Sequence, residues 1–246
     1  MTAILKRDLN SYFNSAIGYV VLAIFYFFAG LFFYFTSIYS QRGSLEGTFA
    51  SMFIIILMIA PIITMKSFSE EKKQRTDQAL LTAPLNLLQI VLGKFLAAFL
   101  LFSICVSIFI VFAFIISFFG VPEWSKILCT TLGVLLFGGA LIAIDIFVSA
   151  LTESQVIAVI VGIGSGLLIY LLDSISAMLK NMASSAAWLS SAMSGLSSVI
   201  SNISFTARYT NFTSGILNLA DVLFFISVIC LFIFFTVRIF ERKRWA

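Results

Sequence analysis

The residues whose types and spacing could support chemistry gather in one charged stretch, residues 66–94, KSFSEEKKQRTDQALLTAPLNLLQIVLGK. This stretch separates two apolar runs in a chain that is 61% hydrophobic and only 11% charged. A nucleotide-binding phosphate loop would need a glycine five positions before Gly93 and a Ser or Thr directly after Lys94. Leu88 and Phe95 occupy those two positions. We therefore expect any nucleotide to be bound by another polypeptide.

The chain has no histidine, so it lacks the commonest metal ligand and general base. Its apolar runs also hold no G-x-S-x-G serine motif and no paired carboxylates. Intramembrane hydrolases and transferases need convergent polar residues of these kinds. The sequence therefore argues against an enzyme, and we expect no catalytic residue, no metal site and no cofactor.

Asp145 is the one strongly polar residue well inside an apolar run, GGALIAIDIFVSALT. A carboxylate at mid-span costs about 2.5–3.5 kcal/mol on insertion scales, so it should have a partner or a function. Two interpretations stay open: Asp145 lines a transport path or gate, or it serves packing through a hydrogen bond or an ion pair with a residue such as Lys94. Pro61 should kink its helix and is a candidate hinge. Asp173 and Asp221 lie at span ends and are interpreted as solvated boundary residues.

The elements that position these residues are six apolar runs, each near the 20 residues that cross a bilayer as a helix. They cover residues 17–38, 48–65, 90–119, 127–151, 155–175 and 217–239. A mean hydropathy of +1.11 excludes a soluble globular protein. Such proteins also carry about a quarter charged residues, whereas this chain carries 11%. The composition predicts an all-α polytopic membrane protein, with residues 1–246 forming a single transmembrane domain.

An even number of spans puts both termini on one side of the membrane, and basic residues indicate which side is cytoplasmic. The side of the termini carries eleven of the 15 basic residues: Lys6, Arg7, Lys66, Lys72, Lys73, Arg75, Lys94, Arg238, Arg242, Lys243 and Arg244. The other side carries Arg42, Lys126, Lys180 and Arg208. We therefore predict that both termini and the loop around residues 66–94 are cytoplasmic.

Two amphipathic segments accompany the spans. Residues 1–15 place apolar and basic residues on opposite helical faces, which predicts an interfacial helix whose basic residues face anionic lipid. Residues 176–214 repeat larger apolar residues every three or four positions, which predicts one or two helices on the outer mouth or a coiled-coil seam with a partner. Gly162 and Gly166 would let a neighbouring helix approach closely, which favours dimerisation.

Residues 66–89 are predicted to form a cytoplasmic coupling segment. The first part is a mixed-charge run, and its charges would fix the register of a docked partner. The second part is short and amphipathic, and it ends at a proline that cannot continue a helix. Such a segment can dock in a groove of a soluble protein; the alternative is an inert solvated loop. The candidate coupling residues are Glu70, Glu71, Lys72, Lys73, Arg75, Thr76, Leu80, Leu81 and Pro84.

Three motifs resemble those of ABC-2 type permeases. The first is E-E-K-K-x-x-T-x-x-x-L-L-T-x-P, which begins at Glu70 and is followed by G-K at residues 93–94. The second is S-x-L-T-x-x-Q-x-x-A at residues 149–158, and the third is the last span with its basic tail, residues 211–245. The resemblance covers the whole chain and is closest to the gliding-motility-associated subgroup, with copper-export and antibiotic-export permeases nearby.

The resemblance implies a type V exporter permease fold, with an N-terminal interfacial helix and six transmembrane helices. It implies a subunit that couples ATP hydrolysis by a separate cytoplasmic ABC ATPase to export across the bacterial inner membrane. The implied partners are that ATPase, a second permease copy or paralogue, an accessory membrane subunit and membrane lipid, but not nucleic acid. Thr152, Glu153 and Gln155 would form a second cytoplasmic joint.

Two other classes of function remain open on the sequence alone. An ion-coupled secondary transporter should show internal repeats, broken helices and several mid-span charges. This sequence has one mid-span carboxylate, Asp145, and no evident repeat, which argues against that class. A non-transporting scaffold or assembly subunit is the second alternative.

Overall fold

A computed structural model describes residues 1–40, 44–75, 86–118, 122–185 and 204–245. Every regular element in these ranges is a helix, which confirms the predicted all-α fold. In chain order the helices are α1 (Thr2–Asn14), α2 (Ala16–Phe33), the π-helix η1 (Tyr34–Tyr39), α3 (Glu46–Thr64), α4 (Ser69–Lys73), α6 (Leu87–Val106), α7 (Ile108–Ser117), α8 (Trp124–Leu151), α9 (Gln155–Ser185), α11 (Phe205–Thr213) and α12 (Leu219–Trp245).

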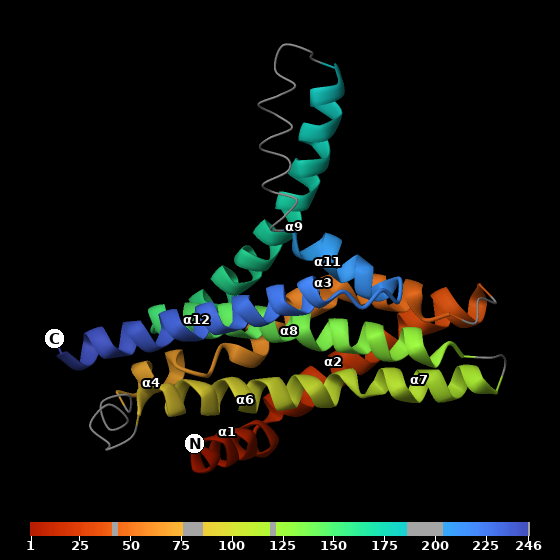
Figure 1. Cartoon of the computed structure of the whole chain (residues 1–246). Coiled ribbons are helices and arrows are strands. Elements are labelled where there is room, and N and C mark those ends of the chain that lie inside the picture. The colour runs from red at the N-terminus through yellow and green to blue at the C-terminus, as the bar shows by residue number, and fades with distance from the viewer. Residues whose placement is uncertain (41–43, 76–85, 119–121, 186–203, 246) are drawn as a thin grey trace.

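Six helical stretches are long and apolar enough to cross a membrane, which confirms the predicted spans. They are Ala16–Tyr39, Glu46–Lys73, Leu87–Ser117, Trp124–Leu151, Gln155–Leu172 and Leu219–Arg242. The chain is thus a multi-pass membrane protein. Both termini lie at the end of the bundle that also carries α4, on the left in Figure 1. We call this end the terminal end and the opposite one the far end.

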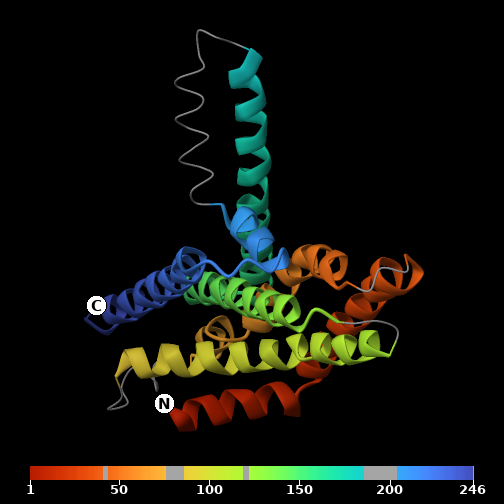
Figure 2. The same cartoon turned by 45° about the vertical axis from the view of Figure 1, so that its right-hand side comes forward.

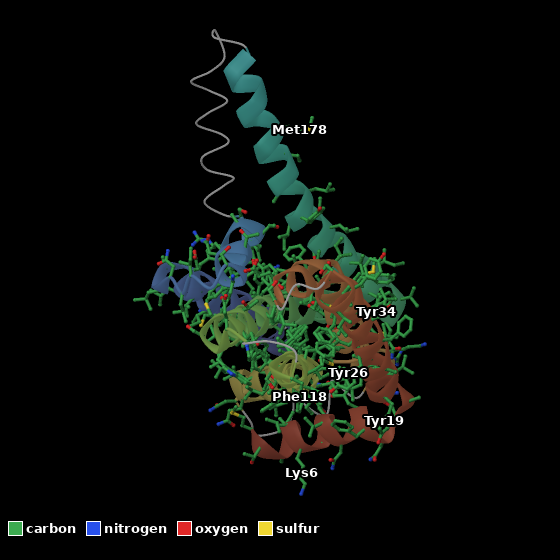
Figure 3. The ribbon with its side chains drawn as sticks, turned by 90° about the vertical axis from the view of Figure 1, so that its right-hand side faces the viewer. Lys6, Tyr19, Tyr26, Tyr34, Phe118 and Met178 are labelled. Carbon is green, nitrogen blue, oxygen red and sulfur yellow. The ribbon has the colours of Figure 1, made fainter. Side chains whose placement is uncertain are left out.

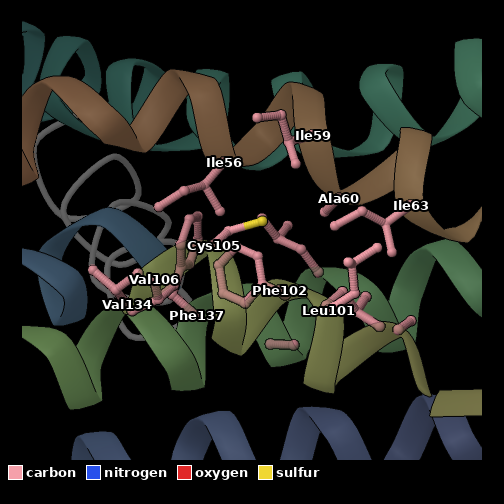
Figure 4. Close-up of a cluster of buried hydrophobic side chains, with 14 of the residues drawn as sticks. Ile56, Ile59, Ala60, Ile63, Leu101, Phe102, Cys105, Val106, Val134 and Phe137 are labelled. Carbon is pink, nitrogen blue, oxygen red and sulfur yellow. The ribbon is translucent and has the colours of Figure 1, made fainter. Parts of the chain in front are cut away.

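Helices α3, α6 and α8 form the centre of the bundle. Figure 4 shows Ile56 of α3, Phe102 of α6 and Phe137 of α8 in one cluster of buried side chains. In lipid, helices associate through close packing, because apolar contact with a neighbour is little better than contact with acyl chains. Gly138 of α8 meets this need, since a Cβ at this position would overlap the ring of Phe102.

Helix α1 lies along the terminal end, but it packs on the chain's own spans (Figure 2). Ile4 and Tyr12 are buried, and Arg7 pairs with Glu71 of α4 at 2.7 Å. Arg7 therefore binds a protein carboxylate, whereas the sequence predicted that it faces lipid. Lys6, on the other face, points away from the body of the protein (Figure 3).

Helix α11 packs on the far ends of α3 and α8. It begins at Ser204, whose Oγ accepts a hydrogen bond from the backbone N–H of Ala207 at 3.0 Å. The hydroxyl of buried Tyr209 donates to the carbonyl of Phe49 at 2.8 Å. Of the amphipathic segment predicted over 176–214, α9 and α11 account for the two ends, and residues 186–203 lie outside the described ranges.

Asp221, at the start of α12, is buried and not solvated at a boundary as the sequence suggested. Its Oδ1 accepts from the Arg208 guanidinium at 2.7 Å, and its Oδ2 accepts from the Asn211 amide at 3.0 Å. Both donors come from α11, so the interpretation as a solvated residue failed because the partners belong to a separate helix. The side chain of Asp173 lies outside the described residues.

Two of the glycines in α9, Gly162 and Gly166, make close contacts inside the chain. A Cβ at Gly162 would lie 2.8 Å from both Asp145 Oδ1 and Pro61 Cβ, and one at Gly166 would lie 2.8 Å from Leu57 Cδ2. The pair thus brings α9 against α3 and α8 of the same molecule, and its interpretation as a dimerisation motif is wrong. Beyond these contacts, the second half of α9 projects away from the body (Figures 1 and 2).

Candidate functional site

Hydrogen bonds at the terminal end tie α4 to the end of α8, in a contact region that we call the α4 junction. Ser149 Oγ accepts hydrogen bonds from the backbone N–H groups of Phe68 and Ser69, each at 3.2 Å. Lys72, which is buried, donates its ammonium group to the carbonyl of Ala150. Unpaired N–H groups at a helix start need an acceptor, and here that acceptor belongs to another helix. The short α4 and the last turn of α8 are therefore expected to move together.

Lys94 links α4 to α6 and α1. Its ammonium group, only 3% exposed, lies 2.9 Å from Glu71 Oε1, 3.3 Å from Asp8 Oδ2 and 2.6 Å from the carbonyl oxygen of Ser67. It also lies 4.9 Å from the centre of the Phe68 ring. A buried ammonium is tolerated only when such acceptors replace its water shell. Lys94 is therefore the central residue of this junction.

Arg7 supplies the second cation of the network. Its guanidinium lies 2.7 Å from Glu71 and 2.8 Å from Asp8, so two cations and two carboxylates share their charges. Arg7 is 52% exposed, in contrast to Lys94. Because an exposed pair is screened by water, its contribution to stability should be much smaller than that of the buried pairs.

Two aromatic residues, Tyr12 and Phe68, complete the junction. The hydroxyl of Tyr12 donates to the carbonyl of Ile63 in α3 at 2.8 Å. Burial raises the pKa of Tyr12, and the charge of Asp8 raises it further, so the hydroxyl stays a neutral donor. The ring of Phe68 packs on Phe240 of α12 at a centroid distance of 4.6 Å. The segment around α4 thus contacts α1, α6, α8 and α12.

The candidate coupling residues in and just after α4 divide between inward-facing and exposed positions. Glu71 and Lys72 point into the junction, whereas Lys73 and Arg75 are exposed. Glu70 is partly exposed, 4.0 Å from Lys66. Thr76, Leu80, Leu81 and Pro84 lie outside the described residues.

The predicted second joint lies between α8 and α9, and both of these helices contact α4. Thr152 ends α8 in an extended conformation. Glu153 is exposed, and Thr152 and Gln155 are partly buried. The two candidate coupling regions are therefore neighbours in space although 80 residues separate Ser69 from Ser149.

Asp145 lies in the interior of the bundle, at a contact of α8 with α3 and α9. It is 4% exposed, and its Oδ2 has no hydrogen-bond partner among the described residues. Lys94 makes its bonds elsewhere, so the ion pair considered from the sequence is not observed. The carboxyl group packs against Gly162 next to Pro61. Helix α3 continues through Pro61 to Thr64, and the roles of Asp145 in a path or gate and of Pro61 as a hinge stay predictions.

Sequence reasoning missed the network partners of α4. Two signals pointed to them: Asp8 breaks the amphipathic pattern of the first helix, and Lys94 opens an apolar run of more than 20 residues. Ser149 opens the S-x-L-T-x-x-Q-x-x-A motif at residues 149–158, but the motif does not say what its hydroxyl contacts. Only the packing of α8 against α4 identifies it as an acceptor.

The fold and its polar contacts are those of a multi-pass membrane protein. Six spans surround an apolar core, and the polar groups join helices to one another at the two ends. Within the ranges that the structure describes, no group of three His, Cys, Asp or Glu residues could hold a metal ion. The α4 junction is the strongest candidate for a functional site in this membrane protein.

Residues 3–245 match the family model described as ABC-2 family transporter protein. Because the match covers nearly the whole chain, the chain belongs to this family and is an ABC transporter permease. A search of curated proteins found no match. The family match confirms the resemblance to ABC-2 permeases, and the gliding-motility-associated subgroup stays a prediction from the motifs.

Proposed function

We propose that this chain is the permease subunit of an ABC exporter and that a separate ATPase subunit docks on α4 and on the joint at residues 152–155. The observation that carries the proposal is the α4 junction. A five-residue helix is bonded to the end of α8 and, through Lys94, to α6 and α1. A force on α4 would therefore reach several spans at once.

The mechanism that follows is a rigid-body movement. Closure of the ATPase on nucleotide would displace α4 together with the last turn of α8, and the Lys94 network would carry the displacement to α1 and α6. Packed helices change between discrete arrangements and do not deform continuously. The expected result is a tilt of the spans that opens a path for substrate.

The exposed face of α4 supports a partner with acidic groups. Lys73 at the end of α4 and Arg75 just after it are exposed, and charges of this kind fix the orientation of a docked protein. On the basic-residue distribution, we place the terminal end in the cytoplasm and the chain in a bacterial inner membrane. A second copy of the chain, or a paralogue, would complete the transport path between two permeases.

The test is copurification from native membranes. Affinity-tagged wild-type chain should bring down a nucleotide-binding subunit and ATP hydrolysis, and Lys73→Glu should reduce both because it reverses a charge on the docking face. The matched control is Lys6→Glu, which reverses another exposed lysine on a surface that points away from the bundle. Wild-type chain without any ATPase would favour the scaffold alternative. Equal yields for the two variants would remove α4 from the docking role.

A further inference from the structure

A polar cavity of about 350 Å³ lies at the terminal end, between α1 and the corner where α3 passes into α4. Its charged lining consists of three cations and three carboxylates: Arg7, Lys66, Lys94, Asp8, Glu70 and Glu71. The formal charges cancel. A purely anionic or purely cationic ligand would therefore meet as many repulsive as attractive charges.

The charges of the cavity divide into an inner group and an outer pair. The inner group is the network of Lys94, in which Lys94 and Arg7 each pair with both Asp8 and Glu71. The outer pair is Lys66 and Glu70, which are 4.0 Å apart and 29% and 34% exposed. This separation is longer than a good hydrogen bond. Glu70 Oε1 accepts a hydrogen bond from the Gln74 amide at 3.4 Å, so Lys66 and the second oxygen of Glu70 retain capacity for a ligand.

A ligand that satisfies the outer pair needs an anion and an ammonium group close together. A phosphate oxygen can accept from the ammonium of Lys66, and a primary ammonium can donate to the carboxylate of Glu70. A quaternary ammonium has no N–H to donate. The chemistry therefore favours a phosphate joined to a primary amine by a short linker.

The surface of α3 identifies the ligand as a lipid. Ile54, Met58 and Ile62 follow one another at four-residue steps within α3, which ends at Thr64; Lys66 follows in the turn, and Glu70 lies in α4. Side chains four residues apart share a helix face. Ile54 and Met58 are 48% and 44% exposed, so an apolar stripe lies on the surface of α3, which runs toward the terminal end where Lys66 and Glu70 lie. An acyl chain on this stripe would deliver its headgroup to the cavity.

We propose that the cavity binds the headgroup of a phospholipid that carries a primary amine, as an ethanolamine phospholipid does. Lys66 binds the phosphate, Glu70 binds the ammonium, and one acyl chain lies on the stripe of α3. The site depends only on residues of this chain, and it does not depend on the proposed ATPase docking.

The test measures lipid binding to the full-length purified protein by native mass spectrometry. We expect phosphatidylethanolamine to be retained at least tenfold better than phosphatidylcholine or phosphatidylglycerol with the same acyl chains. Soluble glycerophosphoethanolamine should not compete at equal concentration, because it lacks the chain that lies on the stripe. The selectivity of the unmodified protein decides the question: equal retention of the three lipids, or preference for phosphatidylglycerol, overturns the proposal.

Two variants locate the site. Lys66→Gln and Glu70→Gln should each weaken phosphatidylethanolamine binding by roughly tenfold, which corresponds to loss of one charge-assisted hydrogen bond. Lys66→Arg should retain binding, and the control Lys6→Gln should leave it unchanged. If Lys66→Gln reduces copurification of an ATPase but leaves lipid selectivity intact, the cavity serves protein docking and the lipid proposal is wrong.

Discussion

Replacement of Lys94 by methionine should destabilise the protein more than any other single change at the terminal end. The substitution keeps most of the apolar stem but removes an ammonium group that has three acceptors, Glu71, Asp8 and the Ser67 carbonyl. Of the two cations that bind both carboxylates, the half-exposed Arg7 then remains. Breaking a buried pair from one side costs about 3–5 kcal/mol, because a buried charge is left without compensation.

Arg7→Met is the control against which the loss of stability in Lys94→Met is compared. Arg7 contacts the same two carboxylates, but it is 52% exposed where Lys94 is 3% exposed. Water and salt screen an exposed pair, so the expected loss is about 0–1 kcal/mol. Lys6→Met, on the outward face of α1, should have no measurable effect. The expected order of stability is therefore wild type and Lys6→Met, then Arg7→Met, then Lys94→Met.

The assay is thermal unfolding of the purified chain in one fixed detergent and lipid mixture, with denaturant unfolding as a second probe. The double variant Lys94→Met/Glu71→Leu should lose less than the sum of the single losses, because no buried carboxylate is left without its partner at that position. A Lys94→Met protein as stable as Arg7→Met would refute the network as the main tie between α4, α6 and α1.

The remaining predictions concern the interior and the orientation. Gly162→Ala should destabilise by about 1–3 kcal/mol through overpacking, since its Cβ would lie 2.8 Å from Asp145 Oδ1 and Pro61 Cβ, whereas Gly164→Ala, with nothing within 4 Å, should be neutral or slightly stabilising in the same unfolding assay. If Asp145 serves a path or gate, Asp145→Asn should preserve stability and change ATP turnover of the complex. If Asp145→Asn leaves turnover unchanged and Asp145→Leu lowers the stability, the residue serves packing instead. A cysteine at Gln74 should react with an impermeant thiol reagent only from the cytoplasmic face, and a cysteine introduced at Glu123 only from the outside; the reverse pattern would overturn the orientation.

The spans could be predicted from the sequence because long apolar runs leave few alternatives to a helix in lipid. These apolar runs do not indicate which polar residues of different helices contact one another. Asp221 looked solvated at a span end, and it became buried because α11 folds back and brings Arg208 and Asn211 to it. A contact of this kind depends on the path of a connecting segment, and no pattern within one span contains that information.

The glycine spacing in α9 shows a related limit. Two glycines four apart predict that a helix comes close, and a close helix is present at both positions. The sequence could not tell whether that helix belongs to the same chain or to a second copy. At the α4 junction, the charged run contains Glu71 and Lys72, which contact other helices, but the sequence did not show which of its residues face inward.

Site-specific photo-crosslinking in native membranes tests the central claim most directly, because it captures whichever protein lies against α4 in the membrane. A photoreactive residue at Lys73, on the exposed face of α4, should form an adduct whose second component is a nucleotide-binding ATPase, identified by mass spectrometry. The same residue at Lys6 should form no such adduct. An adduct at Lys73 with a protein that binds no nucleotide, or the same ATPase adduct from both positions, would contradict the assignment of α4 as the coupling element of an ABC exporter.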